Sequence, residues 1–306
     1  MAIVTGVDCT TSRLGSGLEA CQAIEGLPNG FILVPKGWSR NKTTDTFDKT
    51  YVQEQCQTGN FIPLVGCFEM VSETPDAVTQ ESQSGLMEVV RQGKPVFTGT
   101  YKNGLAFQKI AYSYNSYNQY DVLITYETGF IKCAESVDGT EIKGLSVGML
   151  NTNGYTENNG SNSASTIIKF QITDPFEYNQ YVNLLTELDF NPNTEIFGIT
   201  DCKLTGTADA SDNKAYVSVK WLHNEQFNIL GLSTSNFRLT INGVADVITA
   251  VTYNSSTGLY SITPTTAFVA DQTVVVQLYD ATVPTTTAKV GNKLYRGTTA
   301  NITVVA

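Results

Sequence analysis

The sequence predicts a mainly β protein with two domains. Short apolar runs, many with every second residue polar, follow one another between Gly, Asn, Asp and Pro turns. Charge is divided unevenly, because residues 1–212 carry 13 basic and 25 acidic side chains, whereas residues 213–306 carry 6 and 4. The 306 residues suit two domains of ordinary size, roughly 100–200 residues each.

Residues 1–212 are expected to form a β domain of the sandwich or barrel-forming kind. Residues 1–60 show no sustained periodicity and predict strands with a long loop through Ser39–Asp48. The polar stretch Ser72–Gly85 predicts a loop or a β-arm. Strands are expected at residues 31–34, 61–71 with a turn near Gly66, 87–91, 95–98, 121–126, 129–134, 142–150 and 166–172.

Two short helices interrupt this pattern. In Gly104–Tyr114, apolar residues at positions 105, 106, 110 and 114 have the spacing of one amphipathic helix. A second helix is expected to begin at Pro175 with Thr173 or Asp174 as its cap, and to continue through Leu188. The Asp138-Gly139 pair predicts a hairpin turn, because glycine adopts the positive φ that such turns require.

The domain boundary is expected in the small, polar segment Thr207–Asn213. Beyond it, about seven short strands at intervals of 8–12 residues are typical of an immunoglobulin-like β-sandwich. Strand candidates lie at 215–221, 237–241, 247–253, 258–263, 273–279 and 299–305. Asn242-Gly243 and other turn sequences separate them.

Composition excludes several classes of function. Charged residues make up only 16% of the chain, so its surface is rich in Ser, Thr, Asn, Gln and Tyr, which suits broad protein contacts. The acidic first domain argues against a nucleic-acid clamp, which needs Lys and Arg to replace counterions on phosphate. The beginning of the chain does not resemble a secretory signal, and no apolar run has membrane-spanning length. We therefore expect folding in a cytoplasm.

The six cysteines are expected to be free, buried thiols. They form no Cys-x-x-Cys pair, and a single histidine, His223, is available as a further metal ligand. We expect no metal site and no cofactor. The cysteines are Cys9, Cys21, Cys56, Cys67, Cys133 and Cys202.

One catalytic pattern is present but lacks its context. Gly144-Leu-Ser146-Val-Gly148 matches the Gly-x-Ser-x-Gly nucleophile elbow, with His223 as the only available base. That elbow needs a sharp turn from a strand into a helix, and Asn151-Thr-Asn-Gly154 is unsuited to begin one. We interpret Ser146 as part of an ordinary strand, His223 as a surface or packing residue, and the chain as having no catalytic site.

Two other groups of residues are interpreted as structural and not as binding sites. Asp209, Ser211, Asp212 and Asn213 loosely resemble a calcium loop but lack its 12-residue spacing and its final Glu, so they are interpreted as a linker. A run of tyrosines is interpreted as interface or core rather than as a base-stacking platform, since Lys109 is the only cation nearby. These tyrosines are Tyr112, Tyr114, Tyr117, Tyr120 and Tyr126.

Residues 142–188 resemble phage tail-tube and related virion proteins. The resemblance lies in the strand Ile142–Leu150, the Asn/Gly loop, the strand Ser165–Ile172 and Thr173-Asp-Pro175 opening a helix. It implies two sheets with a flanking helix, in subunits that form rings, usually hexamers, whose sheets join around the DNA path. It also implies that long loops and arms link successive rings. Residues 215–306 separately resemble the immunoglobulin-like modules appended to phage tail and capsid proteins.

The resemblance implies a structural virion protein made in the host cytoplasm, whose partners are further copies of itself and other virion proteins. Transient, non-specific passage of DNA would fit an acidic lumen, which repels phosphate. A capsid-decoration protein or a neck or hub ring remains open as an alternative. A carbohydrate-binding surface module, with Trp38, Tyr155 or the tyrosines as its platform, is an alternative of another class.

Overall fold

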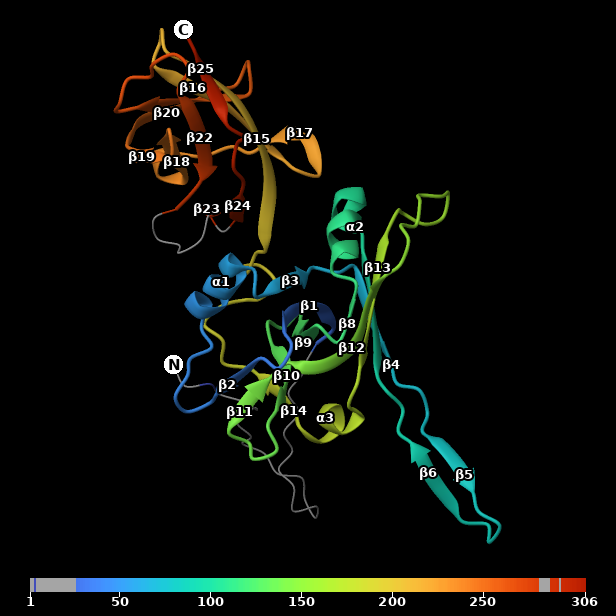
Figure 1. The fold of residues 1–306 in the computed structure, drawn as a ribbon. Coiled ribbons are helices and arrows are strands. Elements are labelled where there is room, and N and C mark those ends of the chain that lie inside the picture. Colours follow the sequence, from blue (N-terminus) through green and yellow to red (C-terminus); the bar gives the residue numbers. More distant parts are fainter. Residues whose placement is uncertain (1–2, 4–25, 281–286, 292) are drawn as a thin grey trace. The chain divides into compact units, whose positions relative to one another are not determined.

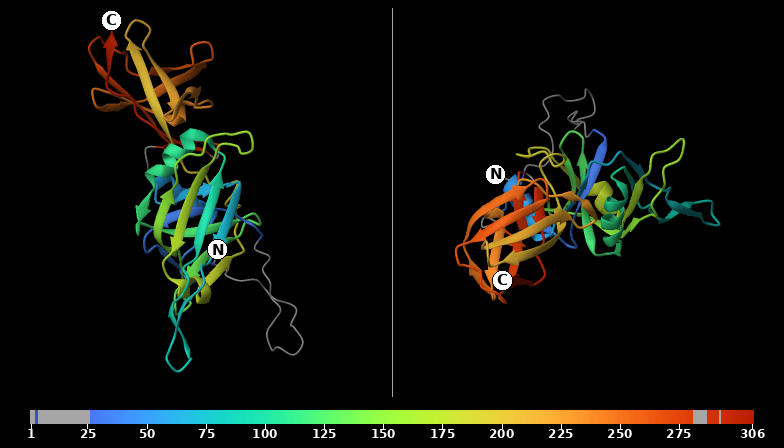
Figure 2. Two further views of the ribbon diagram at one scale, coloured as in Figure 1. Left: turned by 90° about the vertical axis from the view of Figure 1, so that its right-hand side faces the viewer. Right: turned by 90° about the horizontal axis from the view of Figure 1, so that it is seen from above.

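The computed structural model describes residues 3, 26–280, 287–291 and 293–306, which form two compact units. Unit 1 comprises the chain through Gln55 together with Asn60–Ile196, and unit 2 comprises Cys56–Gly59 together with Phe197–Ala306. Both units consist mainly of β-strands, as predicted (Figures 1 and 2).

Unit 1 is built on one continuous, curled sheet. Its main path runs β2-β11-β10-β9-β12-β13-β7-β4, with β1 and β3 beside β9, β14 beside β10 and β8 beside β12. The strands are β1 (Pro28–Pro35), β2 (Ser39–Asn41), β3 (Ile62–Val65), β4 (Glu69–Glu73), β7 (Val96–Tyr101), β8 (Ser116–Tyr117), β9 (Tyr120–Tyr126), β10 (Ile131–Glu135), β11 (Glu141–Lys143), β12 (Leu145–Thr152), β13 (Thr166–Ile172) and β14 (Val182–Leu185).

Strand β12 connects the two halves of this sheet. Its first residues pair with β9, where Leu145 lies opposite Val122, and its later residues pair with β13, where Leu150 lies opposite Phe170. A register shift follows Val147, at the point where the strand leaves one partner for the other. Bulges bend a strand and increase its twist, so this position lets the sheet curl around its core.

The core of unit 1 is aromatic and lies on the inner face of the curl. The ring of Phe170 on β13 lies 4.9 Å from Phe31 on β1 and 5.0 Å from Phe97 on β7. Alternating burial along β7 and β13 shows that every second side chain enters this core. Helix α2 (Gly104–Ser113) contributes Ala111 to it, and helix α3 (Pro175–Gln180) contributes Tyr178.

Two helix predictions need correction. Helix α3 begins at Pro175 with Asp174 as its cap, but it ends at Gln180 instead of Leu188, because residues 182–185 pair with β10. Helix α1 (Lys49–Thr58) was not expected. It places Val52 and Cys56 on its buried side, and the Asp48 carboxylate accepts a 2.8 Å hydrogen bond from the Tyr51 N–H. That Asp cap was the available sequence signal.

The single strand expected at 142–150 is also divided. It forms β11 and β12 on either side of Gly144, where an added Cβ would lie 2.6 Å from the Cβ of Asp121. The helix at Gly104–Tyr114 and the turn at Gly66 are confirmed, the latter with φ of +74°.

Unit 2 is a β-sandwich-like fold. Its main path runs β19-β18-β22-β25-β15-β16-β21-β20, and β25 pairs in parallel with β15 and antiparallel with β22, which joins the two layers. All six strands expected from the sequence are present. The strands are β15 (Ile199–Asp209), β16 (Lys214–Trp221), β17 (Asn224–Asn228), β18 (Phe237–Ile241), β19 (Val244–Asp246), β20 (Ile248–Asn254), β21 (Leu259–Pro264), β22 (Thr273–Leu278), β23 (Thr287–Val290), β24 (Lys293–Arg296) and β25 (Ile302–Val305).

The boundary predicted at residues 207–213 lies too late in the chain. Residues Thr207–Asp209 are the end of β15, and the next residues turn into β16, so both strands belong to unit 2. Small polar residues are favoured in hairpin turns as well as in linkers, and composition alone does not separate the two. The acidic residues of β15 and its turn obscured the boundary further, because they match the charge of unit 1.

Candidate assembly surfaces

The most exposed element of unit 1 is a two-stranded hairpin, here called the arm. It consists of β5 (Val78–Glu81) and β6 (Met87–Arg91), and it projects from the end of β4 and β7 (Figure 1). Every residue of both strands is exposed. The sequence predicts a loop or a β-arm at Ser72–Gly85, and the structure has a β-arm there.

The arm carries apolar side chains despite this exposure. Leu86 is 68% exposed, Met87 66% and Val90 62%. Met87 lies opposite Glu81 and Val89 opposite Thr79, so these four side chains share one face. Exposed apolar groups on a hairpin without a core of its own are typical of surfaces that contact another molecule.

The two ends of the arm are fixed locally. At the tip, the Leu86 N–H donates to the Ser82 hydroxyl at 3.1 Å, and Gly85 has φ of +79°. At the stem, a Cβ added at Gly93 would lie 1.6 Å from the Pro75 carbonyl oxygen. Glycine therefore permits a close approach of the two stem segments that other residues would prevent.

The sheet of unit 1 also ends in open edges. In the part formed by β4, β7, β13, β12 and β8, strand β4 pairs only with β7, and β8 pairs only with β12. Exposed apolar groups accompany both edges, with Phe68 and Val71 at β4 and Tyr117 on β8, which is 81% exposed. Unpaired backbone groups at such edges can accept a strand from another chain.

The outer face of this sheet is polar. One cross-strand row runs through Val71, Thr98, Lys169 and Asn151, all of them partly or fully exposed. Helices α2 and α3 both contribute to the core on the opposite, inner face. This row therefore presents a hydroxyl, an amide and one cation beside a valine.

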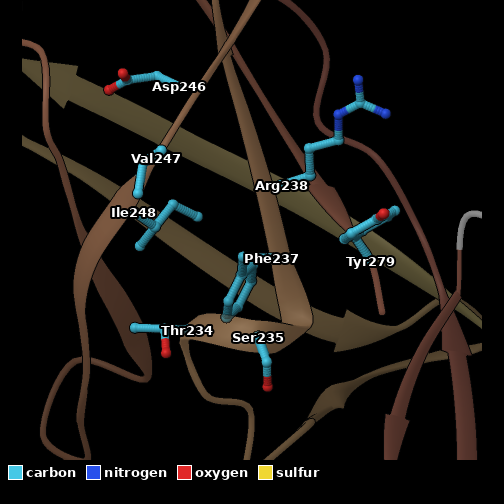
Figure 3. A pocket seen from close by; sticks show the side chains of 8 residues that line it. All are labelled: Thr234, Ser235, Phe237, Arg238, Asp246, Val247, Ile248 and Tyr279. Atoms are coloured by element: carbon cyan, nitrogen blue, oxygen red, sulfur yellow. The ribbon is translucent and has the colours of Figure 1, made fainter. Parts of the chain in front are cut away.

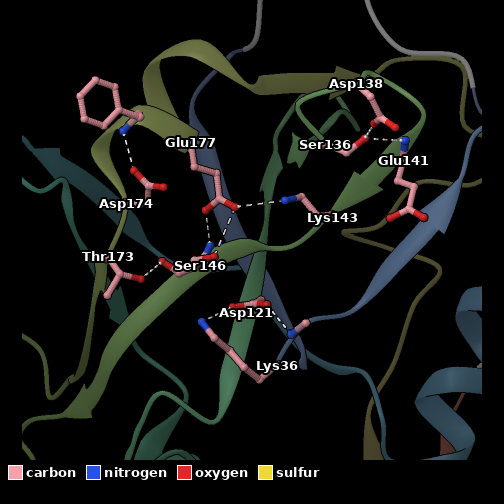
Figure 4. A network of polar contacts seen from close by, with 12 residues as sticks. Lys36, Asp121, Ser136, Asp138, Glu141, Lys143, Ser146, Thr173, Asp174 and Glu177 are labelled. Atoms are coloured by element: carbon pink, nitrogen blue, oxygen red, sulfur yellow. Dashed lines mark hydrogen bonds and ion pairs between the residues drawn. The ribbon is translucent and has the colours of Figure 1, made fainter.

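Ser146 lies within β12 and not at a turn from a strand into a helix (Figure 4). Its N–H donates to the Glu177 carboxylate at 2.7 Å, and its hydroxyl lies 3.3 Å from the same carboxylate. The Thr173 hydroxyl donates to the Ser146 carbonyl oxygen at 2.8 Å. These bonds fix β12 at the place where it changes partners, which gives Ser146 a structural role.

The residues considered as a catalytic base or as a calcium loop lie in unit 2. His223 lies in the turn between β16 and β17 of unit 2 and is partly buried. Asp209 accepts bonds from the N–H and hydroxyl of Ser211, and its pKa is lowered by them, as expected for a turn. The Asp212 carboxylate accepts a hydrogen bond from the Tyr216 hydroxyl. Within the described ranges, no three His, Cys, Asp or Glu side chains are placed to bind a metal ion.

The aromatic candidates divide between core and surface. Tyr126 is buried and Tyr114 and Tyr120 pack against the core, whereas Tyr112 and Tyr117 are exposed. Trp38 packs edge-on against Phe61, with ring centres 5.4 Å apart, and its indole N–H donates to the Tyr51 hydroxyl. Tyr155 is half-buried.

The described cysteines are free, as predicted. Cys56, Cys133 and Cys202 are buried, and burial raises the pKa of each thiol to about 12. Cys67 is only partly buried, and burial raises its pKa to about 11. Cys9 and Cys21 lie outside the described residues. A raised pKa leaves these thiols protonated and unreactive near neutral pH.

The chain matches no protein-family model and no curated protein sequence. None of the helices in the described parts of the chain is long and apolar enough to cross a lipid bilayer.

Proposed function

We propose that this chain is a structural virion protein that closes into a homo-oligomeric ring, and that such rings stack as a phage tail tube. The arm is the observation that supports this most strongly. An isolated two-stranded hairpin is marginally stable in water, and this one exposes Leu86, Met87, Val89 and Val90. A contact with another copy of the chain would cover these groups.

The open edges support closure into a ring. The β4 edge and the β8 edge lie at opposite ends of one sheet and are different surfaces. A contact between two different surfaces is head-to-tail, so repeating it produces a ring when the rotation closes. Closure also pairs the edges, which otherwise favour uncontrolled aggregation.

The distribution of charge supports passage of DNA. Residues 1–196, which include all of unit 1, carry 22 acidic and 12 basic side chains, a formal excess of 10 acidic groups. A lumen lined by such a domain repels phosphate, and in the cross-strand row through Thr98 and Asn151, Lys169 is the one cation that could hold it. DNA would then move through the ring without binding. A capsid-decoration protein or a neck or hub ring would use the same edges with a different symmetry.

Electron microscopy of the purified full chain in negative stain tests the proposal. We expect rings, usually of six subunits, and stacks of rings at high protein concentration. Val71→Lys, which places a charge on the β4 edge, should release monomers. Val137→Lys is the matched control, because Val137 is 79% exposed in a turn away from both edges. Solitary wild-type particles at high concentration would refute the proposal.

A further inference from the structure

Unit 2 contains an open depression beside the crossing from β19 to β20 (Figure 3). Its volume is about 600 Å³, within the range of roughly 300–1,000 Å³ found for small-ligand sites. Phe237 lies at its centre, Val247 and Ile248 line one side, and Arg238 and Tyr279 line the other. Thr234 and Ser235 close one end.

Arg238 is the charged group that distinguishes this depression. It is exposed, and its guanidinium carbon lies 5.8 Å from the centre of the Tyr279 ring. Among the described residues, no carboxylate forms an ion pair with it. The neighbouring carboxylate, Asp246, already accepts the Thr266 N–H at 3.0 Å and the Thr266 hydroxyl at 2.9 Å. The guanidinium is therefore available to an anion from outside.

The remaining groups suit a sugar ring. Tyr279 offers an aromatic face, and Val247 and Ile248 offer apolar surface across from it. The hydroxyl of Thr234 has no hydrogen-bond partner among the described residues, so it can bond to a ligand. An open shape suits a residue within a polymer better than an enclosed small molecule.

We propose that this depression binds an acidic saccharide, with the carboxylate of a uronic acid on Arg238 and the sugar ring between Tyr279 and Val247. Guanidinium and carboxylate match in geometry and charge. The proposal is independent of ring assembly, because all of its residues belong to unit 2.

Saturation-transfer difference NMR with the full chain tests it, since the method detects weak binding to monomers and large assemblies alike. The probe is a hyaluronan tetrasaccharide, which carries glucuronate, and chitotetraose is the neutral comparison. We expect transfer to the acidic probe and much less to the neutral one. Arg238→Gln should weaken binding about tenfold or more, the loss of a hydrogen bond to a charged group.

Lys293→Gln is the matched control, because it removes one positive charge from an exposed position elsewhere in unit 2. It should bind the acidic probe like the wild type, and Tyr279→Ala should bind it weakly. No transfer to the acidic probe, equal transfer to both probes, or equal losses in the Arg238 and Lys293 variants would each overturn the proposal. Ring formation is scored separately by microscopy, so failure of one proposal leaves the other standing.

Discussion

Two hairpins of this chain use the same antiparallel pairing in opposite ways. In β15–β16 the strands pair from Cys202 opposite Trp221 to Asp209 opposite Lys214, and alternate side chains enter the core of unit 2. In the arm, β5 and β6 pair in the same sense, yet none of their residues is buried.

The difference concerns what stabilises each hairpin. Backbone pairing contributes little net free energy in water, so a hairpin depends on a buried face. The β15–β16 hairpin has such a face within its own unit, where Val217 and Ala208 are fully buried. The arm has none, which is why we propose that another copy of the chain covers it.

Truncating one leucine in each hairpin tests the comparison directly. Leu204→Ala in β15 removes a side chain that is 5% exposed, and it should lower the free energy of unfolding of unit 2 by about 2–5 kcal/mol. Leu86→Ala at the arm should change the stability of the unassembled chain by less than about 0.5 kcal/mol. Urea unfolding followed by hydrogen-exchange mass spectrometry reports each unit through its own peptides. Equal losses in the two variants would break the comparison.

Adding one methyl group at a glycine should have a smaller effect. A Cβ at Gly206 in β15 would lie 2.6 Å from the Tyr216 carbonyl oxygen, so Gly206→Ala should destabilise unit 2 by about 1–3 kcal/mol. Gly93→Ala at the stem should instead separate the stem segments, redirect the arm and impair stacking. Urea unfolding of both variants measures the loss of stability, and electron microscopy measures the loss of stacking. A Gly206→Ala variant as stable as the wild type would contradict the packing shown here.

Charge on the arm should affect assembly and leave the fold intact. Val89→Glu places a second carboxylate on the face of the arm that carries Met87, Val89 and Glu81. It should prevent stacking, while the free energy of unfolding changes by no more than about 0.5 kcal/mol. Val244→Glu is the control, since Val244 is 71% exposed in unit 2 and lies outside the proposed contacts. Sedimentation velocity compares the two. Normal stacking of the Val89 variant would remove the arm from the proposed contact.

The smallest effect concerns the turn of the β15–β16 hairpin. Hydrogen bonds from the Ser211 hydroxyl and N–H lower the pKa of Asp209 in the folded chain. The ionised Asp209 therefore contributes to the stability of unit 2 above its unfolded pKa, and this contribution is lost as pH falls through its folded pKa. In the Asp209→Asn variant, this part of the loss of unit 2 stability at acidic pH should disappear. The tip of the arm uses the Ser82 hydroxyl and should show no such dependence. Unfolding midpoints measured across acidic pH decide this, and an unchanged profile in Asp209→Asn would refute it.

Local sequence patterns were sufficient to predict the β class, most strands, helix α2 and the start of helix α3. These features depend on local chemistry. Apolar and polar side chains alternate along β13, Asp174 caps the start of helix α3, and glycine permits the positive φ of the turn at Gly66. Ser146 was likewise interpreted correctly as a strand residue, because the helix that an elbow needs was missing from the sequence that follows.

The remaining features depend on contacts that form only in the folded chain. Residues 182–185 became a strand because β10 offered a partner, and helix α1 formed with little periodicity because Val52 and Cys56 found a buried surface. Strand β15 belongs to unit 2 because it also pairs with β24 and β25, which lie far from it in the sequence. The arm is exposed because β5 and β6 pair only with each other among the described strands. The depression beside Arg238 also brings together β18, β19 and the end of β22. Local sequence records what a segment prefers, but burial and pairing depend on which distant segments it meets.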